Sequence, residues 1–212
     1  MLEDVSLFAN IPPERLSELE KSATLRKYPK NTLLFMEGDD HGQLFIIKSG
    51  LVCAHTDDEE GRQLVLNYMS AGEYFGELSL LDRKPRSASV STIKDSQLLS
   101  ISRDSFEDFL KEYPDVYQVL IVSLVDRIRS LTGNVKGMAL LDVYGRVAQT
   151  LERLCGQEND AEKPRLTHQD IANMVGASRE MVSRIMKELV LGGYIEVKAK
   201  KVSLLKTFPK HW

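Results

Sequence analysis

Hydrophobic and polar positions change their spacing twice along the first half of the chain. Before residue 30 the pattern indicates short helices, with Pro12 and Pro13 at a helix start and apolar Leu16 and Leu19 after them. Between residues 32 and 101, short β-rich runs alternate with glycine-containing turns, which is typical of an antiparallel barrel or roll. These runs are residues 33–35, 44–47, 64–66 and 89–91.

Helical spacing returns after Ser102. From Asp115 onward, apolar residues recur at alternating steps of four and three, which is the repeat of a coiled-coil seam. This repeat favours a homodimer, and the alternative is a helix that packs on its own domain. The predicted interface is Tyr117, Ile121, Leu124, Ile128, Leu131 and Val135, and Met138 continues the repeat.

The last third of the chain has the pattern of a winged helix-turn-helix. An amphipathic helix over residues 140–154 precedes a polar loop, residues 156–164. Thr167 and Asp170 then have the spacing of a capping box, and Ser178 can cap a helix over residues 179–189. The alternating runs 194–197 and 202–205 predict a hairpin, the wing, with lysines at its tip.

Charge is unevenly distributed between this last part and the rest. Residues 165–212 contain nine basic and four acidic residues, a balance of +5, whereas the whole chain carries −3. The other residues therefore carry −8. A basic end on an acidic body indicates a nucleic-acid partner, and the alternative is an ordinary solvated surface.

Composition excludes several classes of protein. The chain has 212 residues, 42% hydrophobic and 28% charged, which is enough apolar residues for a folded core. No apolar run is long enough to span a bilayer, and acids at the N-terminus do not fit a secretory signal. Cys53 and Cys155 are expected to be free thiols. These features predict a soluble cytoplasmic protein with no membrane association.

One segment of the β-rich part carries candidate binding chemistry. Gly76 permits a tight turn that exposes backbone amides, Arg86 offers a bidentate fork to a phosphate, and Ser87 adds a hydroxyl. Glu77 is an acceptor for sugar hydroxyls. No nucleophile, metal-ligand set or catalytic motif accompanies these residues, so the sequence predicts a binding protein with no catalytic residues, metal or catalytic cofactor.

The segment resembles the phosphate-binding cassette of the cyclic-nucleotide-binding domain, with Gly-Glu-Leu at 76–78 and Pro-Arg-x-Ala at 85–88. Residues 139–151 and 176–184 also resemble segments of the Crp/Fnr regulators, in the catabolite activator branch. This resemblance implies an α+β fold: an N-terminal antiparallel, jelly-roll-like β-roll, a long dimerisation helix and a C-terminal winged helix-turn-helix. The expected domains are residues 1–114, 115–138 and 139–212.

The resemblance also implies roles for individual residues. The effector, expected to be cyclic AMP, would be bound by Leu66, Gly76, Glu77, Leu78, Ser79, Arg86, Ser87, Ala88 and Thr132. Double-stranded DNA with a palindromic TGTGA-like site would be bound by Thr167, His168, Ser178, Arg179, Glu180, Ser183, Arg184, Lys200 and Lys201. RNA polymerase is a further expected partner, touched by loop 156–164.

One departure from the family concerns the long helix. Where the family has adjacent Thr-Ser beside the adenine, this chain has Leu131-Thr132. The effector could therefore be another molecule, such as cyclic di-GMP, or be absent. A haem effector is disfavoured because His41 and His55 are expected in solvated turns. The oxygen-sensing branch of the family, which binds an iron–sulfur cluster through N-terminal cysteines, is disfavoured because residues 1–52 lack cysteine. A cyclic-nucleotide-binding scaffold for a protein partner is the alternative from another functional class.

Overall fold

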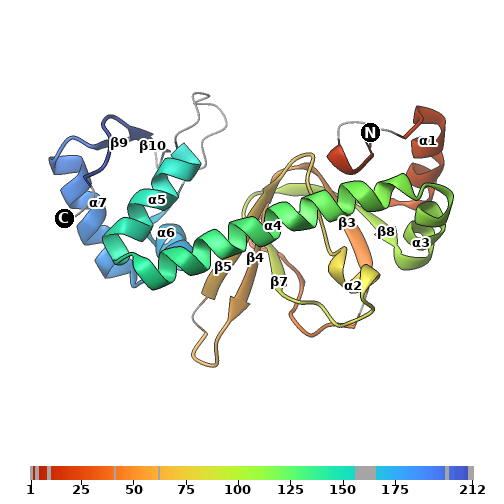
Figure 1. Cartoon of the computed structure of the whole chain (residues 1–212), viewed down its shortest axis with the longest axis horizontal. Coiled ribbons are helices and arrows are strands. Elements are labelled where there is room, and N and C mark those ends of the chain that lie inside the picture. The colour runs from red at the N-terminus through yellow and green to blue at the C-terminus, as the bar shows by residue number, and fades with distance from the viewer. Residues whose placement is uncertain are drawn as a thin grey trace. The chain divides into compact units, whose positions relative to one another are not determined.

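A computed structural model describes Leu2 and residues 5–8, 11–40, 42–61, 63–155, 166–198 and 201–209 (Figure 1). The chain forms two compact units. Unit 1 consists of residues 1–57 and 65–128, and unit 2 of residues 58–64 and 129–212.

Unit 1 contains two four-stranded sheets. One has the order β1 (Thr24–Tyr28), β8 (Ser96–Ser102), β3 (Gln43–Ser49), β6 (Tyr74–Phe75). The other has the order β2 (Leu33–Phe35), β7 (Ser89–Thr92), β4 (Leu51–Asp57), β5 (Gln63–Ser70), whose first two residues belong to unit 2. The described pairings are antiparallel, which confirms the predicted class of sheet.

Strand β3 shows why both sheets hold together. Its alternate side chains point to opposite faces, and both faces are buried. Leu44 and Ile46 join a core that also includes residues of the helices, whereas Phe45 and Ile47 join a second core with residues of the other sheet, such as Val52 and Val90. The second core therefore lies between the sheets.

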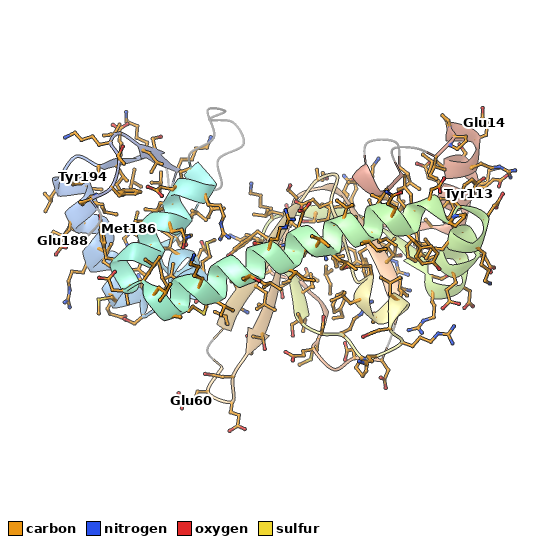
Figure 2. All side chains as sticks on the ribbon, in the orientation of Figure 1. Glu14, Glu60, Tyr113, Met186, Glu188 and Tyr194 are labelled. Atoms are coloured by element: carbon orange, nitrogen blue, oxygen red, sulfur yellow. The ribbon has the colours of Figure 1, made fainter. Side chains whose placement is uncertain are left out.

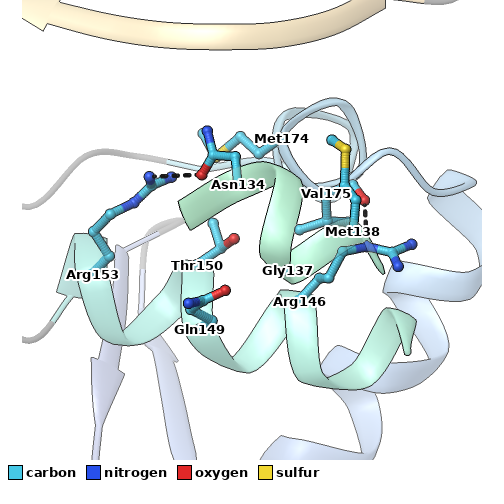
Figure 3. A pocket seen from close by; sticks show the side chains of 9 residues that line it. All are labelled: Asn134, Gly137, Met138, Arg146, Gln149, Thr150, Arg153, Met174 and Val175. Atoms are coloured by element: carbon cyan, nitrogen blue, oxygen red, sulfur yellow. Dashed lines mark hydrogen bonds between the residues drawn. The ribbon is translucent and has the colours of Figure 1, made fainter. Parts of the chain in front are cut away.

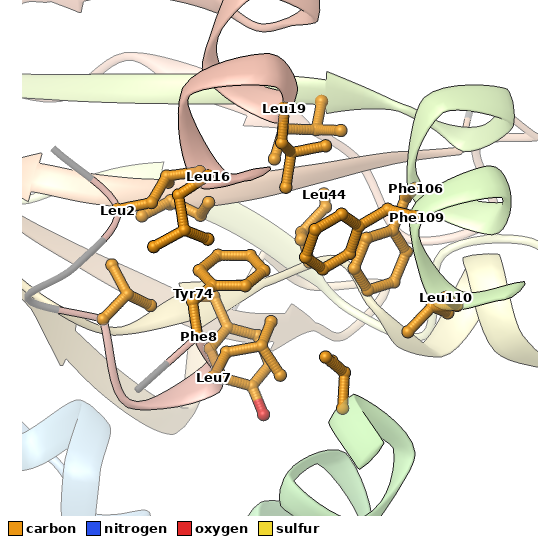
Figure 4. Packing of buried hydrophobic residues seen from close by; sticks show 14 of the residues in the cluster. Leu2, Leu7, Phe8, Leu16, Leu19, Leu44, Tyr74, Phe106, Phe109 and Leu110 are labelled. Atoms are coloured by element: carbon orange, nitrogen blue, oxygen red, sulfur yellow. The ribbon is translucent and has the colours of Figure 1, made fainter. Parts of the chain in front are cut away.

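Short helices cover the outer face of the first sheet. They are the 3-10 helix Ser6–Phe8, α1 (Pro13–Ser22) and α3 (Arg103–Glu112), while α2 (Leu78–Leu81) follows the turn after β6. Figure 4 shows their packing, in which the rings of Phe8 and Phe109 meet edge to face with centroids 5.6 Å apart. Such a pair adds to the stability that apolar burial supplies.

Two sequence-based expectations are wrong in unit 1. Residues 24–28 form strand β1 rather than helix, because they pair along their whole length with β8 although their side chains are mostly exposed. His55 is not solvated in a turn. It lies on β4, is 4% exposed, and its Nε2 lies 3.0 Å from Ser91 Oγ. His41 lies outside the described residues.

Helix α4 (Asp115–Leu140) begins where the seam was predicted to begin. The next helix, α5 (Val143–Cys155), was expected to start at residue 140, but the chain leaves the helical conformation at residues 141 and 142. Asp142 Oδ1 accepts a hydrogen bond from Gly145 N at 2.7 Å, which starts α5 at this break.

Unit 2 contains α5, α6 (His168–Val175), α7 (Arg179–Leu191) and a hairpin of β9 (Ile195–Lys198) with β10 (Lys201–Leu204). Apolar residues of all three helices form its core, including Val147, Ile171 and Met186. Figure 2 labels Met186 on α7. The two short helices, the turn between them and the hairpin that follows confirm the winged helix-turn-helix.

Candidate functional site

A tight turn after β6 brings two distant parts of the cassette together. Gly76 has φ +87°, a conformation that favours glycine. A Cβ atom there would lie 2.6 Å from both Arg86 Nη1 and the carbonyl oxygen of Gln43. Glycine is therefore required twice, for the backbone conformation and for the close approach of the arginine.

Arg86 is a buried cation with protein acceptors on one side of its guanidinium. Its side chain is 5% exposed; Nη1 donates to Gly76 O and Ser79 Oγ, both at 2.9 Å, and Nη2 donates to Gln43 O at 3.0 Å. The guanidinium carbon lies 4.1 Å from the centre of the Phe35 ring. Burial lowers the pKa of Arg86, and the nearby Glu77 opposes this shift.

Glu77 is the matching buried anion. It is 1% exposed, and its Oε1 accepts a hydrogen bond from Arg127 Nη1 at 2.6 Å. Arg127 Nη2 also donates to Tyr74 O at 2.7 Å, so one guanidinium of α4 holds both the carboxylate and the end of β6. Burial raises the pKa of Glu77, and the positive charges of Arg127 and Arg86 oppose this shift.

Each of these two buried charges keeps one polar atom without a partner. Arg86 Nε and Glu77 Oε2 make no hydrogen bond in the described part of the chain, although both atoms are buried. Leaving a buried donor or acceptor unpaired costs about 1–3 kcal/mol. A ligand that carries both an anionic oxygen and a hydroxyl group would satisfy the two atoms.

The remaining predicted ligand residues occupy less buried positions. Ser79 is buried beside Arg86. Leu66 on β5 and Ala88 are half-buried, whereas Leu78 and Ser87 are exposed. Thr132 is exposed on α4 and belongs to unit 2, whereas the cassette belongs to unit 1.

Sequence reasoning missed three residues of this site. Arg127 lies 50 residues from Glu77, and its only local signal is a charged position between Leu124 and Ile128 on the long helix. Gln43 contributes a backbone oxygen, which no residue type reveals. Phe35 gave no signal beyond its place in a predicted strand.

The helix-turn-helix of unit 2 is fixed by local caps. The capping box of Thr167 and Asp170 is present, and the turn passes through Gly176 at φ +61°. Ser178 Oγ then accepts a hydrogen bond from Met181 N and caps α7. Thr167 and Ser178 therefore have roles in helix capping.

Helix α7 exposes the residues expected to read DNA. Arg179, Glu180 and Arg184 are all exposed. His168 Nδ1 lies 2.8 Å from Ser183 Oγ, a contact that joins α6 to α7. On the wing, Lys198 pairs with Glu196 at 2.8 Å. Lys201 lies on β10, and both Lys200 and loop 156–164 lie outside the described residues.

The predicted seam forms a largely exposed apolar row on α4. Ile121, Ile128 and Val135 are 59%, 62% and 66% exposed. Because they are seven residues apart they lie on one side of α4, where they form a row rather than scattered apolar side chains. Leu124 is half-buried. Tyr117 and Leu131 are also exposed.

A small hollow in unit 2 is lined by residues of α4, α5 and α6 (Figure 3). Arg146 Nε donates to Val175 O at 2.8 Å and its Nη1 donates to Leu141 O at 3.0 Å. Arg153 Nη1 donates to Asn134 Oδ1 at 3.4 Å. The arginines of this hollow thus tie neighbouring helices together.

The described residues contain neither a membrane-spanning helix nor a cluster of metal ligands. No helix there has the length and apolar content that crossing a membrane requires. No group of three or more His, Cys, Asp or Glu side chains in the same part of the chain is arranged to hold a metal ion.

Known proteins resemble both parts of this chain. The model of the cyclic nucleotide-binding domain matches residues 25–113, and that of the Crp-like helix-turn-helix domain matches residues 145–207. The cAMP-activated global transcriptional regulator Vfr of Pseudomonas aeruginosa is 32% identical over 203 residues, which are 92% of this chain and 95% of Vfr. A CRP-like cAMP-activated global transcriptional regulator of Mycobacterium tuberculosis is 31% identical, over 95% of this chain and 93% of that protein.

A solved structure is similar over the same length. It is that of the c-di-GMP responsive global regulator CLP of Xanthomonas campestris, with 28% identity, a TM-score of 0.78, and coverage of 92% of this chain and 100% of that one. Both halves of the chain thus match, a cyclic nucleotide-binding domain followed by a DNA-binding domain, and the relatives are regulators rather than enzymes. The chain belongs to the Crp/Fnr family of transcription regulators.

Proposed function

We propose that this regulator is a homodimer gated by cyclic AMP that binds a palindromic TGTGA-like DNA site. The observation that carries the proposal is the buried pair Arg86 and Glu77, each with one atom that lacks a partner. A 3′,5′-cyclic monophosphate supplies both complements, since its phosphate is anionic and its ribose keeps the 2′-hydroxyl. The fork of Arg86 would bind the phosphate, and Glu77 Oε2 would accept from the hydroxyl.

Leu66 would line the apolar wall beside the base, and the backbone around Leu78, Ser79 and Ala88 would approach the phosphate with the hydroxyl of Ser87. Thr132 would contribute a hydroxyl to the base. The assignments within residues 25–113 rest on the match of this range to the cyclic nucleotide-binding domain. The assignment of Thr132, outside this range, rests on the resemblance of the long helix to that of the family.

The DNA-reading assignment rests on the exposed face of α7. Arg184 and Glu180 are four residues apart and share one face of the helix, and Arg179 is in its first turn. Arginine bonds guanine O6 and N7 bidentately, and glutamate accepts from cytosine N4. Thr167, His168, Ser178, Ser183, Lys200 and Lys201 would contribute contacts around this helix and on the wing, mainly to phosphates.

The exposed row on α4 supports the proposed dimer. Two copies that pair through this row would bury its apolar side chains and hold two recognition helices together. Half-sites about 34–36 Å apart would then be read by one dimer. Cyclic AMP would gate this reading by binding one arrangement of the dimer more tightly than another. RNA polymerase is the proposed further partner, through loop 156–164.

Cyclic di-GMP is a second candidate effector, for two reasons. Leu131 stands where the family has the first of two hydroxyl residues, and the similar regulator CLP is described as c-di-GMP responsive. Calorimetric titration of the full chain with cyclic AMP, cyclic GMP and cyclic di-GMP separates the candidates. We expect saturable binding of cyclic AMP. Binding of cyclic di-GMP alone would overturn the proposal that cyclic AMP is the effector. Binding of none of the three would overturn the proposal that a cyclic nucleotide gates the protein.

A further inference from the structure

Arg86 donates to three oxygen atoms of the described residues. Gly76 O and Gln43 O belong to the backbone, whereas Ser79 Oγ belongs to a side chain. Ser79 is 4% exposed on α2, and its hydroxyl also donates to Gly76 O at 3.3 Å. Its lone pairs therefore remain available to Arg86 Nη1. The serine hydroxyl thus links the start of α2 to the cation of the cassette.

The hydrogens of the guanidinium can be counted. Nη1 has two, and both are donated, to Gly76 O and to Ser79 Oγ. Nη2 has two and donates one to Gln43 O, while the single hydrogen of Nε has no acceptor among the described residues. The cassette therefore occupies the Nη1 end and leaves donors on Nε and Nη2 for a ligand.

Ser79 is itself held in place from its other side. Arg103, the first residue of α3, donates from Nη2 to the carbonyl oxygen of Ser79 at 3.0 Å. Arg103 reaches this oxygen by passing over Gly42, where a Cβ atom would lie 2.6 Å from Nη2. A side chain at position 42 would require the end of Arg103 to shift. The serine is thus anchored by its backbone while its hydroxyl orients Arg86.

We propose that Ser79 is a positioning residue that fixes the orientation of Arg86, so that the phosphate is bound through Nε and Nη2 rather than through Nη1. This inference rests on the proposed binding of a cyclic nucleotide. It adds that the hydroxyl of Ser79 sets which edge of the Arg86 guanidinium faces the phosphate. A change in the preference between the two exocyclic oxygens of the phosphate then reports on the orientation of Arg86.

The test uses the full chain, cyclic AMP, and the two phosphorothioate diastereomers of cyclic AMP, in which sulfur replaces one or the other exocyclic oxygen. Ser79→Ala removes the hydroxyl and retains a good helix former. Ser96→Ala is the matched control, because Ser96 is 1% exposed in the same unit and its hydroxyl bonds Leu51 N and Lys94 O instead of Arg86. Both substitutions are also made in an Arg86→Lys background.

We expect the parent to prefer one diastereomer. Ser79→Ala should bind cyclic AMP roughly tenfold more weakly, the effect of losing one hydrogen bond to a charged group, and should lose much of that preference. Ser96→Ala should change neither quantity. In the Arg86→Lys background, Ser79→Ala should change the affinity for cyclic AMP little further, because the serine acts by orienting the guanidinium that lysine lacks.

Two results would overturn the role of Ser79 and leave nucleotide binding intact. One is a Ser79→Ala variant that matches the parent within twofold in affinity and in diastereomer preference. The other is a Ser79→Ala substitution that weakens cyclic AMP binding by the same factor in the parent and in the Arg86→Lys background. A parent chain that binds no cyclic AMP would instead overturn the proposed function, and the role of Ser79 with it.

Discussion

Replacing Arg127 with methionine leaves the carboxylate of Glu77 buried without its cation. The ion pair is 2.6 Å long, Glu77 is 1% exposed and Arg127 is 29% exposed, so solvent screens the pair only in part. Removing one partner of a buried ion pair costs about 3–5 kcal/mol, and the partial exposure of Arg127 favours the lower end, about 3 kcal/mol. With a slope of about 3 kcal/mol per molar urea, the unfolding midpoint of unit 1 should fall by about 1 M.

The assay is urea unfolding of the full chain at pH 7.5, with Arg129→Met as the control. Arg129 lies two residues further along α4, is exposed, and makes no hydrogen bond or ion pair with the part of the chain that the structure describes. The control should unfold within about 0.5 kcal/mol of the parent, as is usual for surface substitutions. If Arg127→Met and the control unfold at the same midpoint, Arg127 does not stabilise Glu77.

The pH dependence supplies an independent check of the same contact. Burial raises the pKa of Glu77 above its ordinary value of 4.5, so the folded state takes up this proton more readily than the unfolded state. The stability due to Glu77 is therefore greatest below pH 4.5 and falls as the pH rises through the raised pKa. Loss of Arg127 raises this pKa further, so the deficit of Arg127→Met should be larger at pH 7.5 than at pH 5.

Three other substitutions test the remaining parts of the account. Arg86→Leu should weaken cyclic AMP binding by about 2–5 kcal/mol in calorimetry, and affinity within threefold of the parent would refute the assignment of the phosphate site. Leu124→Asp should give a monomer in sedimentation with weakened DNA binding, because a buried charge would face its symmetry mate; an intact dimer would show that the row packs on its own domain. Glu180→Ala should relax selection at one base pair of each half-site by about 1–3 kcal/mol in selection from random DNA, and unchanged stringency at every position would exclude base reading.

The sequence predicted those helix ends and the hairpin that depend on interactions between residues close together in the chain. The capping box at Thr167 and the cap at Ser178 involve residues within three positions of each other, and both are present. The start of α4 at Asp115 and the β9–β10 hairpin follow in the same way from short-range patterns. Strand β1 was missed because its side chains are mostly exposed and its hydrogen bonds go to β8, more than 60 residues away.

The cassette was predicted as a set of residue types, but its internal bonding was not. In the sequence, Gly76 indicates a turn, Glu77 an anionic side chain and Arg86 a cationic one, and the structure brings the three together. The partners of the two charges, Arg127 and the carbonyl of Gln43, lie 50 and 43 residues away from them. Spacing along the chain carries no information about such contacts, because they depend on how the sheets and α4 pack.

The most direct test of the account is fluorescence anisotropy of a labelled DNA duplex titrated with the full chain, in the presence and absence of saturating cyclic AMP. The duplex carries two inverted TGTGA-like half-sites about 34–36 Å apart, and ionic strength is kept at a fixed physiological value because phosphate contacts make affinity salt-dependent. We predict at least about tenfold tighter binding with cyclic AMP, which corresponds to a coupling of about 1.4 kcal/mol. Equal affinity with and without the nucleotide would contradict the claim that cyclic AMP gates DNA binding.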